Sequence, residues 1–426
     1  MRPGALPAVL AVLAALAPDA AANGRPPATS GVYFRPGDAR SILVRSTLGL
    51  LVSRDGGCSF RWICEQAIGY AGRFDPKYAV AAGGTIFATT FTGLRVSRDG
   101  GCTWRTATED RPPGDPGRIA GMWVDAIDIG PDGDVWVATA DSGRPNNVYR
   151  STDGGETFAP RGLGSPAIWW KSVKVAPADP RRIYATGYQV AGPPLPDGRP
   201  QPPAAHFRRS DDAGARWTPS PLDGVAVGGT PIVHAIAVDP ARPDVVFLRS
   251  LGASPPSGDR LYRSIDAGRT FREVLATSAA IHDVVLHGGA VLVATVSGAF
   301  RSGDGGATFE RLPAAPQLAC LGAHGDRLLG CGGNWQPDEK AVASSADGGA
   351  SWDKVLRFAE LAGPLACPAG TPAHELCGPR WPGLQQQLGA AGTTRCPAPP
   401  PDPAPPPAPP ARTQGGGCCD AGDDRG

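Results

Sequence analysis

Hydrophobic positions fall in short runs that alternate with polar positions, and a turn signal closes each run. The stretch 123–151 reads WVDAIDIG, PDGD, VWVATA and, after a loop, VYRS, and the stretch 232–264 repeats this order with IVHAIAV, DPARPD, VVFLRS and LYRS. Short runs rich in β-branched and aromatic residues, bounded by Gly, Pro and Asp, are typical of strands. Each unit therefore predicts three strands, a turn, and a fourth strand that begins at an aromatic residue.

The turn before each fourth strand has its own repeated sequence, Ser-x-Asp-x-Gly-x-(Thr/Ser)-aromatic, and only the copy SDDAGARW lacks the hydroxyl residue. The seven copies begin at Ser53, Ser97, Ser151, Ser210, Ser264, Ser302 and Ser345. Their spacing matches the length of a four-stranded propeller blade. One such unit cannot bury its apolar face alone. We therefore predict an all-β fold, a seven-bladed β-propeller of four-stranded blades.

Each residue of the octapeptide has a role in a tight turn. The Asp carboxylate can accept hydrogen bonds from backbone N–H groups of its own turn, and Gly tolerates a positive φ. The aromatic residue places a large apolar side chain on the fourth strand. This chemistry predicts a structural role for the seven aspartates, which are Asp55, Asp99, Asp153, Asp212, Asp266, Asp304 and Asp347.

These octapeptides resemble the Asp-box repeats of the bacterial neuraminidase (BNR) type, over a region that we delimit as residues 23–361. That family includes sialidases, xyloglucan-active glycoside hydrolases, sortilin-type receptors and a photosystem II assembly factor. The resemblance implies an exported bacterial propeller whose octapeptides lie on the face away from any active site. It is specific for the fold and leaves the activity open.

Composition excludes several classes of function. The chain has 41 basic and 40 acidic residues and a formal net charge of +1, which argues against a nucleic-acid partner. Its 58 Gly and 47 Pro residues exclude a helix-dominated fold. Lys supplies only five of the 41 basic residues. We attribute this bias to a GC-rich genome and give it no functional weight.

The two ends of the chain indicate export. Residues 1–22 combine an apolar run at 5–17 with small residues at Ala20 and Ala22, the pattern of a secretory signal peptide, so the mature chain is expected to begin near Asn23. We expect a secreted, periplasmic or cell-surface protein. Residues 397–426 predict a disordered Pro- and Gly-rich tail. The tail resembles the front half of myxobacterial surface-sorting signals without their apolar helix, so membrane attachment would require processing or lipidation of the tail.

Export makes disulfides the expected role of the ten cysteines. A Gly-Asp turn at 325–326 would place Cys320 and Cys331 opposite each other on a hairpin. Residues 362–396 predict a small cap, helical at 384–388, with Cys367, Cys377 and Cys396 available for bridges whose pairing stays open. Neither a metal site nor a cofactor is predicted. No zinc-ligand spacing occurs, and the PDGD sequence at 131–134, whose aspartates could in principle hold calcium, is expected to form a turn.

The sequence offers only weak evidence for a set of catalytic residues. A sialidase needs a Tyr nucleophile activated by Glu, and none of the eight glutamates falls on a predicted inner strand. Other glycosidases use two carboxylates, for which Asp125 and Asp128 are the candidates. An ideal strand directs these two side chains to opposite faces, so they are expected to be solvated or turn-capping groups.

Tryptophans outside the octapeptides suggest a recognition surface. Trp123, Trp169, Trp170 and Trp335 are candidates for stacking on a sugar or anchoring a protein. Packing between blades is the alternative. The long Pro-rich loops at 190–205 and 251–259 are expected to form a wall of the site.

We therefore predict a non-enzymatic binding or scaffold propeller, monomeric, whose loop face recognises a glycan or an extracellular or periplasmic protein. The alternative is a glycoside hydrolase, sialidase-like or xyloglucan-active, working through an aspartate pair. A third hypothesis is an assembly factor.

Overall fold

The seven octapeptides fold into the same hydrogen-bonded turn in the computed structural model. Each Ser hydroxyl donates to the Asp carboxylate two residues later at 2.6–2.9 Å. The same hydroxyl accepts the backbone N–H of the Gly four residues later at 2.7–2.8 Å. The hydrogen bonds donated to Asp347, first that of the Ser351 hydroxyl, lower the pKa of this carboxyl to about 2. The carboxylates therefore hold the turns together.

The Gly that ends each Ser–Gly hydrogen bond also packs against the preceding blade. A Cβ on Gly155 would lie 2.5 Å from the Phe87 ring, and one on Gly268 would lie 2.5 Å from the Phe207 ring. Both glycines have a positive φ, at +86° and +80°. Gly is therefore required twice, for the backbone conformation and for the close approach of an aromatic ring.

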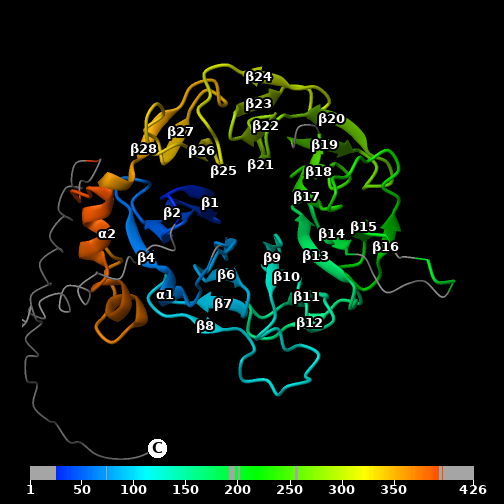
Figure 1. Ribbon diagram of the computed structural model, residues 1–426, viewed down its shortest axis with the longest axis horizontal. Coiled ribbons are helices and arrows are strands. Elements are labelled where there is room, and N and C mark those ends of the chain that lie inside the picture. The colour runs from blue at the N-terminus through cyan, green and yellow to red at the C-terminus, as the bar shows by residue number, and fades with distance from the viewer. Residues whose placement is uncertain are drawn as a thin grey trace, which may run out of the picture. The chain divides into compact units, whose positions relative to one another are not determined.

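Seven four-stranded antiparallel sheets, each built from four consecutive strands, form a ring (Figure 1). The structure describes residues 25–72, 74–190, 197–199, 202–254, 258–392 and 396. Blades one to four comprise β1 (Thr29–Arg35), β2 (Asp38–Ser46), β3 (Gly49–Ser53), β4 (Arg61–Cys64); β5 (Tyr78–Val80), β6 (Ile86–Thr90), β7 (Gly93–Ser97), β8 (Arg105–Thr106); β9 (Val124–Ile129), β10 (Val135–Thr139), β11 (Val148–Ser151), β12 (Ala159–Pro160); and β13 (Ile168–Ala176), β14 (Asp179–Gln189), β15 (Ala204–Ser210), β16 (Thr218–Ser220).

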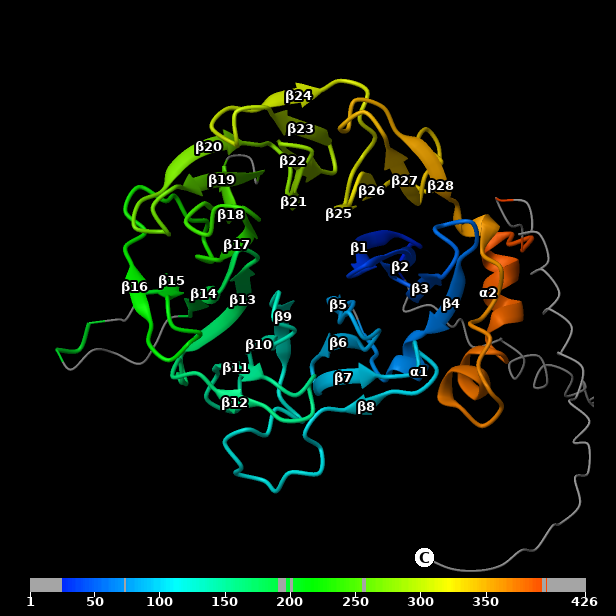
Figure 2. The ribbon, with the colours of Figure 1, turned by 180° about the vertical axis from the view of Figure 1, so that it is seen from behind.

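Blades five to seven comprise β17 (Val233–Val238), β18 (Val246–Ser254), β19 (Gly258–Ser264), β20 (Arg272–Ala276); β21 (Ile281–His287), β22 (Ala290–Thr295), β23 (Gly298–Ser302), β24 (Glu310–Leu312); and β25 (Cys320–His324), β26 (Arg327–Cys331), β27 (Val342–Ser345), β28 (Asp353–Leu356). The first strand of every blade is the inner strand, next to the ring centre (Figure 2). The predicted seven-bladed all-β fold is confirmed. The expected loop at 251–259 is wrong in part, because β18 and β19 extend into it and both continue their antiparallel pairing as far as Ser254 and Gly258.

The core lies between blades. Phe87 and Val96 of the second blade pack with Val124 and Val137 of the third in one buried cluster. Trp136 of the third blade packs in the same way with Trp170 and Val173 of the fourth. Each blade therefore buries apolar side chains on both faces of its sheet, which explains the continuous apolar runs of the second strands.

The first and seventh blades close the ring through side chains, because each blade keeps its own four consecutive strands. Val32 and Leu43 share a buried cluster with Val342 and Leu329. Thr29 Oγ1 donates to the carbonyl of Ala341 at 2.6 Å, and Arg327 donates to the carbonyl of Ala39 at 3.0 Å. The burial of this seam excludes water from the contact between the two ends of the repeat.

A C-terminal cap covers the outer strand of the first blade. The cap contains η1 (Phe358–Glu360), the π-helical turn η2 (Ala373–Cys377) and α2 (Trp381–Leu388), which begins three residues before the predicted helix. The backbone N–H of Trp62 in β4 donates to the carbonyl of Gly363 at 2.9 Å, and the backbone N–H of Leu365 donates to the carbonyl of Trp62 at 2.8 Å. The cap thus adds a short parallel bridge to the edge of the first blade.

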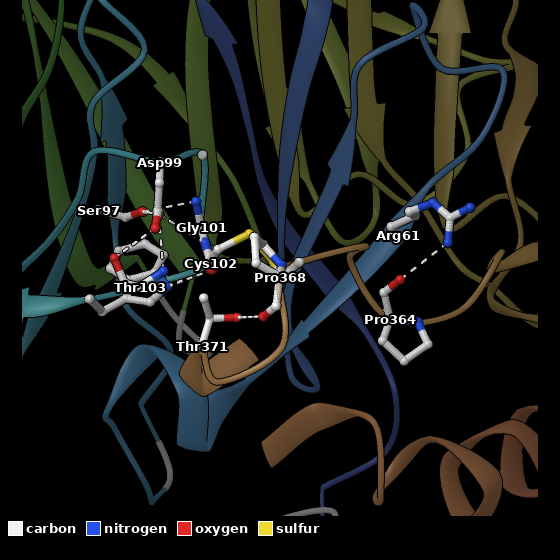
Figure 3. Close-up of a disulfide and its surroundings, with 12 residues drawn as sticks. Arg61, Ser97, Asp99, Gly101, Cys102, Thr103, Pro364, Pro368 and Thr371 are labelled. Carbon is white, nitrogen blue, oxygen red and sulfur yellow. Dashed lines mark hydrogen bonds between the residues drawn. A yellow bond between two sulfur atoms is a disulfide. The ribbon is translucent and has the colours of Figure 1, made fainter. Parts of the chain in front are cut away.

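Two disulfides fix the cap to two neighbouring blades. Cys377 bonds to Cys64, which ends β4 and precedes α1 (Glu65–Ile68), and Cys367 bonds to Cys102 in the second octapeptide (Figure 3). Cys320 and Cys331 form the hairpin disulfide expected from their spacing. Cys58 and Cys396 are also disulfide-bonded.

The described residues up to Gly392 belong to one compact unit, and Cys396 belongs to a second. The predicted signal peptide at 1–22 and tail at 397–426 lie outside the described residues. Within the described ranges, no helix combines the length and apolar character that crossing a membrane requires.

We predict that the bonds to the cap stabilise the closed ring. Replacing Cys64 and Cys377 together by Ser should lower the free energy of unfolding by about 2–5 kcal/mol, because the bridge joins residues far apart in the chain. The cap should also open first, which exposes Arg380 to trypsin. The measurement is a thermal melt with mass spectrometry of the tryptic fragments. The matched control replaces Cys320 and Cys331, which close only a hairpin; early cleavage after Arg380 in this control as well would contradict the prediction.

Candidate functional site

The order of the strands separates two faces of the ring. Every octapeptide joins a third strand to a fourth, so all seven lie on one face, together with the turns between first and second strands. The connections between blades and the loops between second and third strands lie on the opposite face, which we call the loop face. Residues that begin an inner strand or end a second strand are therefore near the loop face.

Exposed apolar side chains are distributed unequally between the two faces. Among the residues whose burial is described, seven large hydrophobic side chains are exposed, and only Ile265 lies in an octapeptide. The other six, Phe74, Phe91, Val190, Val227, Val296 and Trp335, lie in connections of the loop face. Of these six, Phe74 and Phe91 are in ring contact, and the other four lie in separate connections of blades four to seven.

Five aromatic rings form a continuous row across blades two to four, which we call the aromatic strip. Phe74, Phe91 and Trp123 are in mutual contact, with ring centroids 4.8–6.4 Å apart. Trp169 lies 5.9 Å from Trp123, and Tyr188 lies 5.8 Å from Trp169. The strip runs from the exposed Phe74, at 64%, to the buried Tyr188.

Three lysines, which we call the lysine cluster, lie beside the aromatic strip at the ring centre. Lys77 Nζ donates to the carbonyl of Asp125 at 2.7 Å and lies 3.3 Å from its carboxylate, while Lys171 forms an ion pair with the same carboxylate. Lys171 Nζ also lies 4.3 Å from the centroid of the Trp123 ring, a cation–π contact. Lys174 lies three residues further along β13, towards the octapeptide face.

β-bulges place two of these charged groups. The pairing of β9 with β10 passes from Val124 to Ala126, which leaves Asp125 as the extra residue. The pairing of β13 with β14 passes from Trp170 to Ser172 and leaves Lys171 as the extra residue. A bulge interrupts the alternation of side chains and redirects the extra residue. The expectation that Asp125 and Asp128 alternate as on an ideal strand therefore does not apply at Asp125.

The second candidate aspartate links two inner strands. Asp128 accepts the backbone N–H of Val175 from the next blade at 2.8 Å, and Asp283 accepts that of Leu321 in the same way at 3.2 Å. Burial raises the pKa of Asp128, and burial raises that of Asp283 to about 6. Asp125 and Asp128 thus have separate partners, lysines for the first and a backbone amide for the second.

Further cations surround the lysine cluster. Arg249 is held by Asp259 at 2.8 Å, and Arg45 donates to the backbone carbonyl of Asp75 at 2.8 Å. Burial lowers the pKa of His234 well below its ordinary value, and Lys77 and Arg249 are among the nearby cations that add to the effect. His234 is therefore neutral at physiological pH. The positive charge around the lysine cluster, a region of the ring centre that we call the mouth, comes from lysine and arginine.

The four predicted tryptophans fall into two groups. Trp123 and Trp169 belong to the aromatic strip, and Trp335 is 51% exposed in the loop between β26 and β27. Trp170 is 1% exposed and its indole N–H donates to the carbonyl of Leu163, so its ring is part of the core between two blades. The structure therefore removes Trp170 from the candidate surface, because no ligand can reach its ring.

Sequence reasoning missed the lysine cluster, and a signal for it existed. Only five lysines occur in the chain, and three of them lie close enough to His234, on an inner strand, to help lower its pKa. The scarcity of lysine in the sequence is the signal that points to these three residues. Phe74 and Phe91 were missed because aromatic residues outside strands carry no periodic pattern.

The outer part of the third blade holds a cavity of about 350 Å³. Its arginines include Arg111, paired with Asp115 at 3.1 Å, and Arg150, paired with Asp134. It is lined by neither the aromatic strip nor the lysine cluster. No group of three or more metal-ligating side chains occurs among the described residues.

Comparison with solved structures identifies the fold. An ancestral GH74 enzyme matches over 77% of this chain and 46% of its own, with 14% identity and a TM-score of 0.53. The GH74 enzyme of Niastella koreensis matches over 76% and 65% (16% identity, TM-score 0.43), and YCF48 of Cyanidioschyzon merolae over 71% and 92% (15%, 0.49). The chain thus spans less than two thirds of these GH74 structures. No family model and no curated protein matches the sequence. These likenesses concern the propeller fold alone.

We predict that Asp283 destabilises the folded protein at neutral pH. Its pKa is raised on folding, to about 6, so the folded state favours the protonated form, and stability falls as pH rises from about 4 to 6. Asp283→Asn keeps an oxygen that can accept the Leu321 N–H and removes the buried charge. The gain in the free energy of unfolding should be about 1–3 kcal/mol near pH 8 and smaller near pH 5. Urea unfolding at the two pH values measures it, and an equal effect at both would refute the assignment.

Proposed function

We propose that this chain is an exported, non-enzymatic binding protein of the Asp-box propeller family, which recognises a glycan or protein partner through its loop face. One observation carries the proposal: six of the seven exposed large hydrophobic side chains belong to that face. A rigid ring that presents preformed loops pays little ordering entropy on binding.

The site chemistry favours binding over hydrolysis. A glycosidase needs one carboxylic acid and one carboxylate facing the same bond. Asp125 is neutralised by two lysines, and Asp128 is committed to a backbone amide. Neither carboxyl group is therefore available in the way that the hydrolase alternative requires.

Export is proposed from two features. Residues 1–22 have the pattern of a signal peptide. The disulfides fit an oxidising compartment. N-terminal sequencing of the protein recovered outside the cytoplasm should begin near Asn23.

A face-specific pair of variants tests the binding proposal. The chain from residue 23 is screened against polysaccharides and envelope proteins, and the affinity for each ligand found is measured by calorimetry. Phe91→Ser on the loop face should weaken binding about tenfold or more, whereas Ile265→Ser on the octapeptide face should change it less than about twofold. The two side chains are both exposed, at 40% and 64%, so neither change empties a core.

The same screen tests hydrolysis. Each bound polysaccharide is incubated with the protein and assayed for new reducing ends, and we expect none. Turnover that disappears in Asp125→Ala or Asp128→Ala would establish the hydrolase alternative. Ligands that bind equally well to both surface variants would show that the loop face is not the recognition surface.

A further inference from the structure

We propose that the partner is an acidic polypeptide segment, whose carboxylates bind the lysine cluster at the mouth of the ring and whose apolar side chains pack on the aromatic strip. This inference rests on the proposed function and specifies the chemistry of the partner.

The mouth has more cationic than anionic groups in its ion pairs. A single carboxylate, that of Asp125, is shared by Lys77 and Lys171. Arg249 has Asp259 as its own partner. Within the described residues, Lys174 and Arg45 have no carboxylate at ion-pair distance. Lys174 interacts electrostatically with the buried Asp128 and Asp283 carboxyl groups, each of which also accepts a backbone N–H of the next inner strand. An anionic ligand would offset the excess of cations over carboxylates in the ion pairs of Lys77, Lys171 and Arg249.

The electrostatic state of the mouth supports this assignment. Burial lowers the pKa of Lys77, and repulsion from Lys171 and Arg45 adds to the effect, although Asp125 opposes it. The pKa of His234 is lowered for the same reasons, burial first and then four nearby cations. Positive charge is therefore incompletely neutralised at this point, and a ligand carboxylate stabilises it.

The lysine cluster and the aromatic strip form one surface. Lys171 joins them, because its ammonium group contacts both the Asp125 carboxylate and the face of the Trp123 ring. The side chain of Lys77 is 38% exposed, and Phe91 is 40% exposed, so both parts are accessible to the same ligand. One extended chain that carries acidic and apolar groups fits both.

The aromatic strip favours a polypeptide over a sugar. A sugar ring stacks on a free aromatic face. The centroid of the Trp123 ring lies 4.3 Å from Lys171 Nζ and 4.8 and 5.9 Å from the ring centroids of Phe91 and Trp169. These contacts leave little of the Trp123 faces uncovered. The two most exposed rings of the strip are those of Phe74 and Phe91, and three of the other four exposed groups of the loop face are valines; none of these five can hydrogen-bond sugar hydroxyls, and only the fourth, Trp335, has a polar N–H. Such groups match leucine, valine or phenylalanine side chains of a protein.

The experiment uses four probes with the chain from residue 23. They are a short synthetic peptide of Glu and Leu, its Lys–Leu and Glu–Ser counterparts, and polygalacturonate as an acidic glycan. Fluorescence anisotropy at low and high salt gives the affinities. We expect the Glu–Leu peptide to bind best, and its affinity to fall as salt screens the charges. The Lys–Leu peptide should not bind.

Variants locate the contact. Lys174→Gln removes a cation that has no ion-pair partner among the described residues and should weaken Glu–Leu binding about tenfold, while a thermal melt checks that the variant is folded. Phe91→Ser should weaken Glu–Leu binding by a similar factor and leave Glu–Ser binding unchanged. The matched control is Lys354→Gln, which removes a lysine on the outer strand β28, where it pairs with Glu360; binding should be unaffected.

The outcomes separate this inference from the proposed function. Stronger binding of polygalacturonate than of the Glu–Leu peptide, or an equal loss in Lys354→Gln and Lys174→Gln, overturns the acidic-peptide proposal. A natural ligand that depends on Phe91 and not on Lys174 would also overturn it while preserving recognition by the loop face. Ligands that depend on neither residue would overturn both.

Discussion

The bond from the backbone N–H of Gly to the Ser hydroxyl in each octapeptide is the interaction on which the rest of the structure depends. It bends the chain so tightly that the Gly has a positive φ and its Cα lies against the preceding blade. At Gly155 a methyl group would collide with Phe87. One turn therefore fixes both the hairpin between two outer strands and the docking of neighbouring blades, and its repetition defines the ring.

Repetition alone does not close a ring, because the first and last blades are not consecutive in the chain. The octapeptide of the first blade nevertheless contacts the seventh, where a Cβ on Gly57 would lie 3.2 Å from Val355 and Arg327 donates to the carbonyl of Gly56 at 2.9 Å. Here the closure is supplied by buried side chains such as Val32 and Val342 and by a cap that is bonded covalently to two blades. Because the cap bridges to β4 and to the second octapeptide, it holds the beginning of the repeat from outside. A repeat protein with marginal interfaces gains most from such terminal elements.

The sequence predicted features that depend on local chemistry, and it failed for features that depend on the closed ring. The seven turns follow from residues within eight positions of each other, and the bond between Cys320 and Cys331 follows from a short hairpin. The partner of Cys377 is 313 residues away, and no local pattern reveals it. The lysine cluster was missed because it draws on inner strands of separate blades, and the side chain of Lys171 is placed by a bulge that no alternation pattern predicts.

The bulges set a few positions of the inner strands apart from the packing between blades. Outside them, each inner strand alternates its side chains between two neighbouring blades, so nearly every position is constrained by packing. The extra residue of a bulge does not follow this alternation. Five of the seven inner strands contain such an irregularity, and the extra residues are Ser30, Asp125, Lys171, Ile236 and His282. Four of the five are polar, and among the five only Ile236 packs against an apolar cluster. A change at the four polar positions therefore leaves the apolar clusters between blades intact.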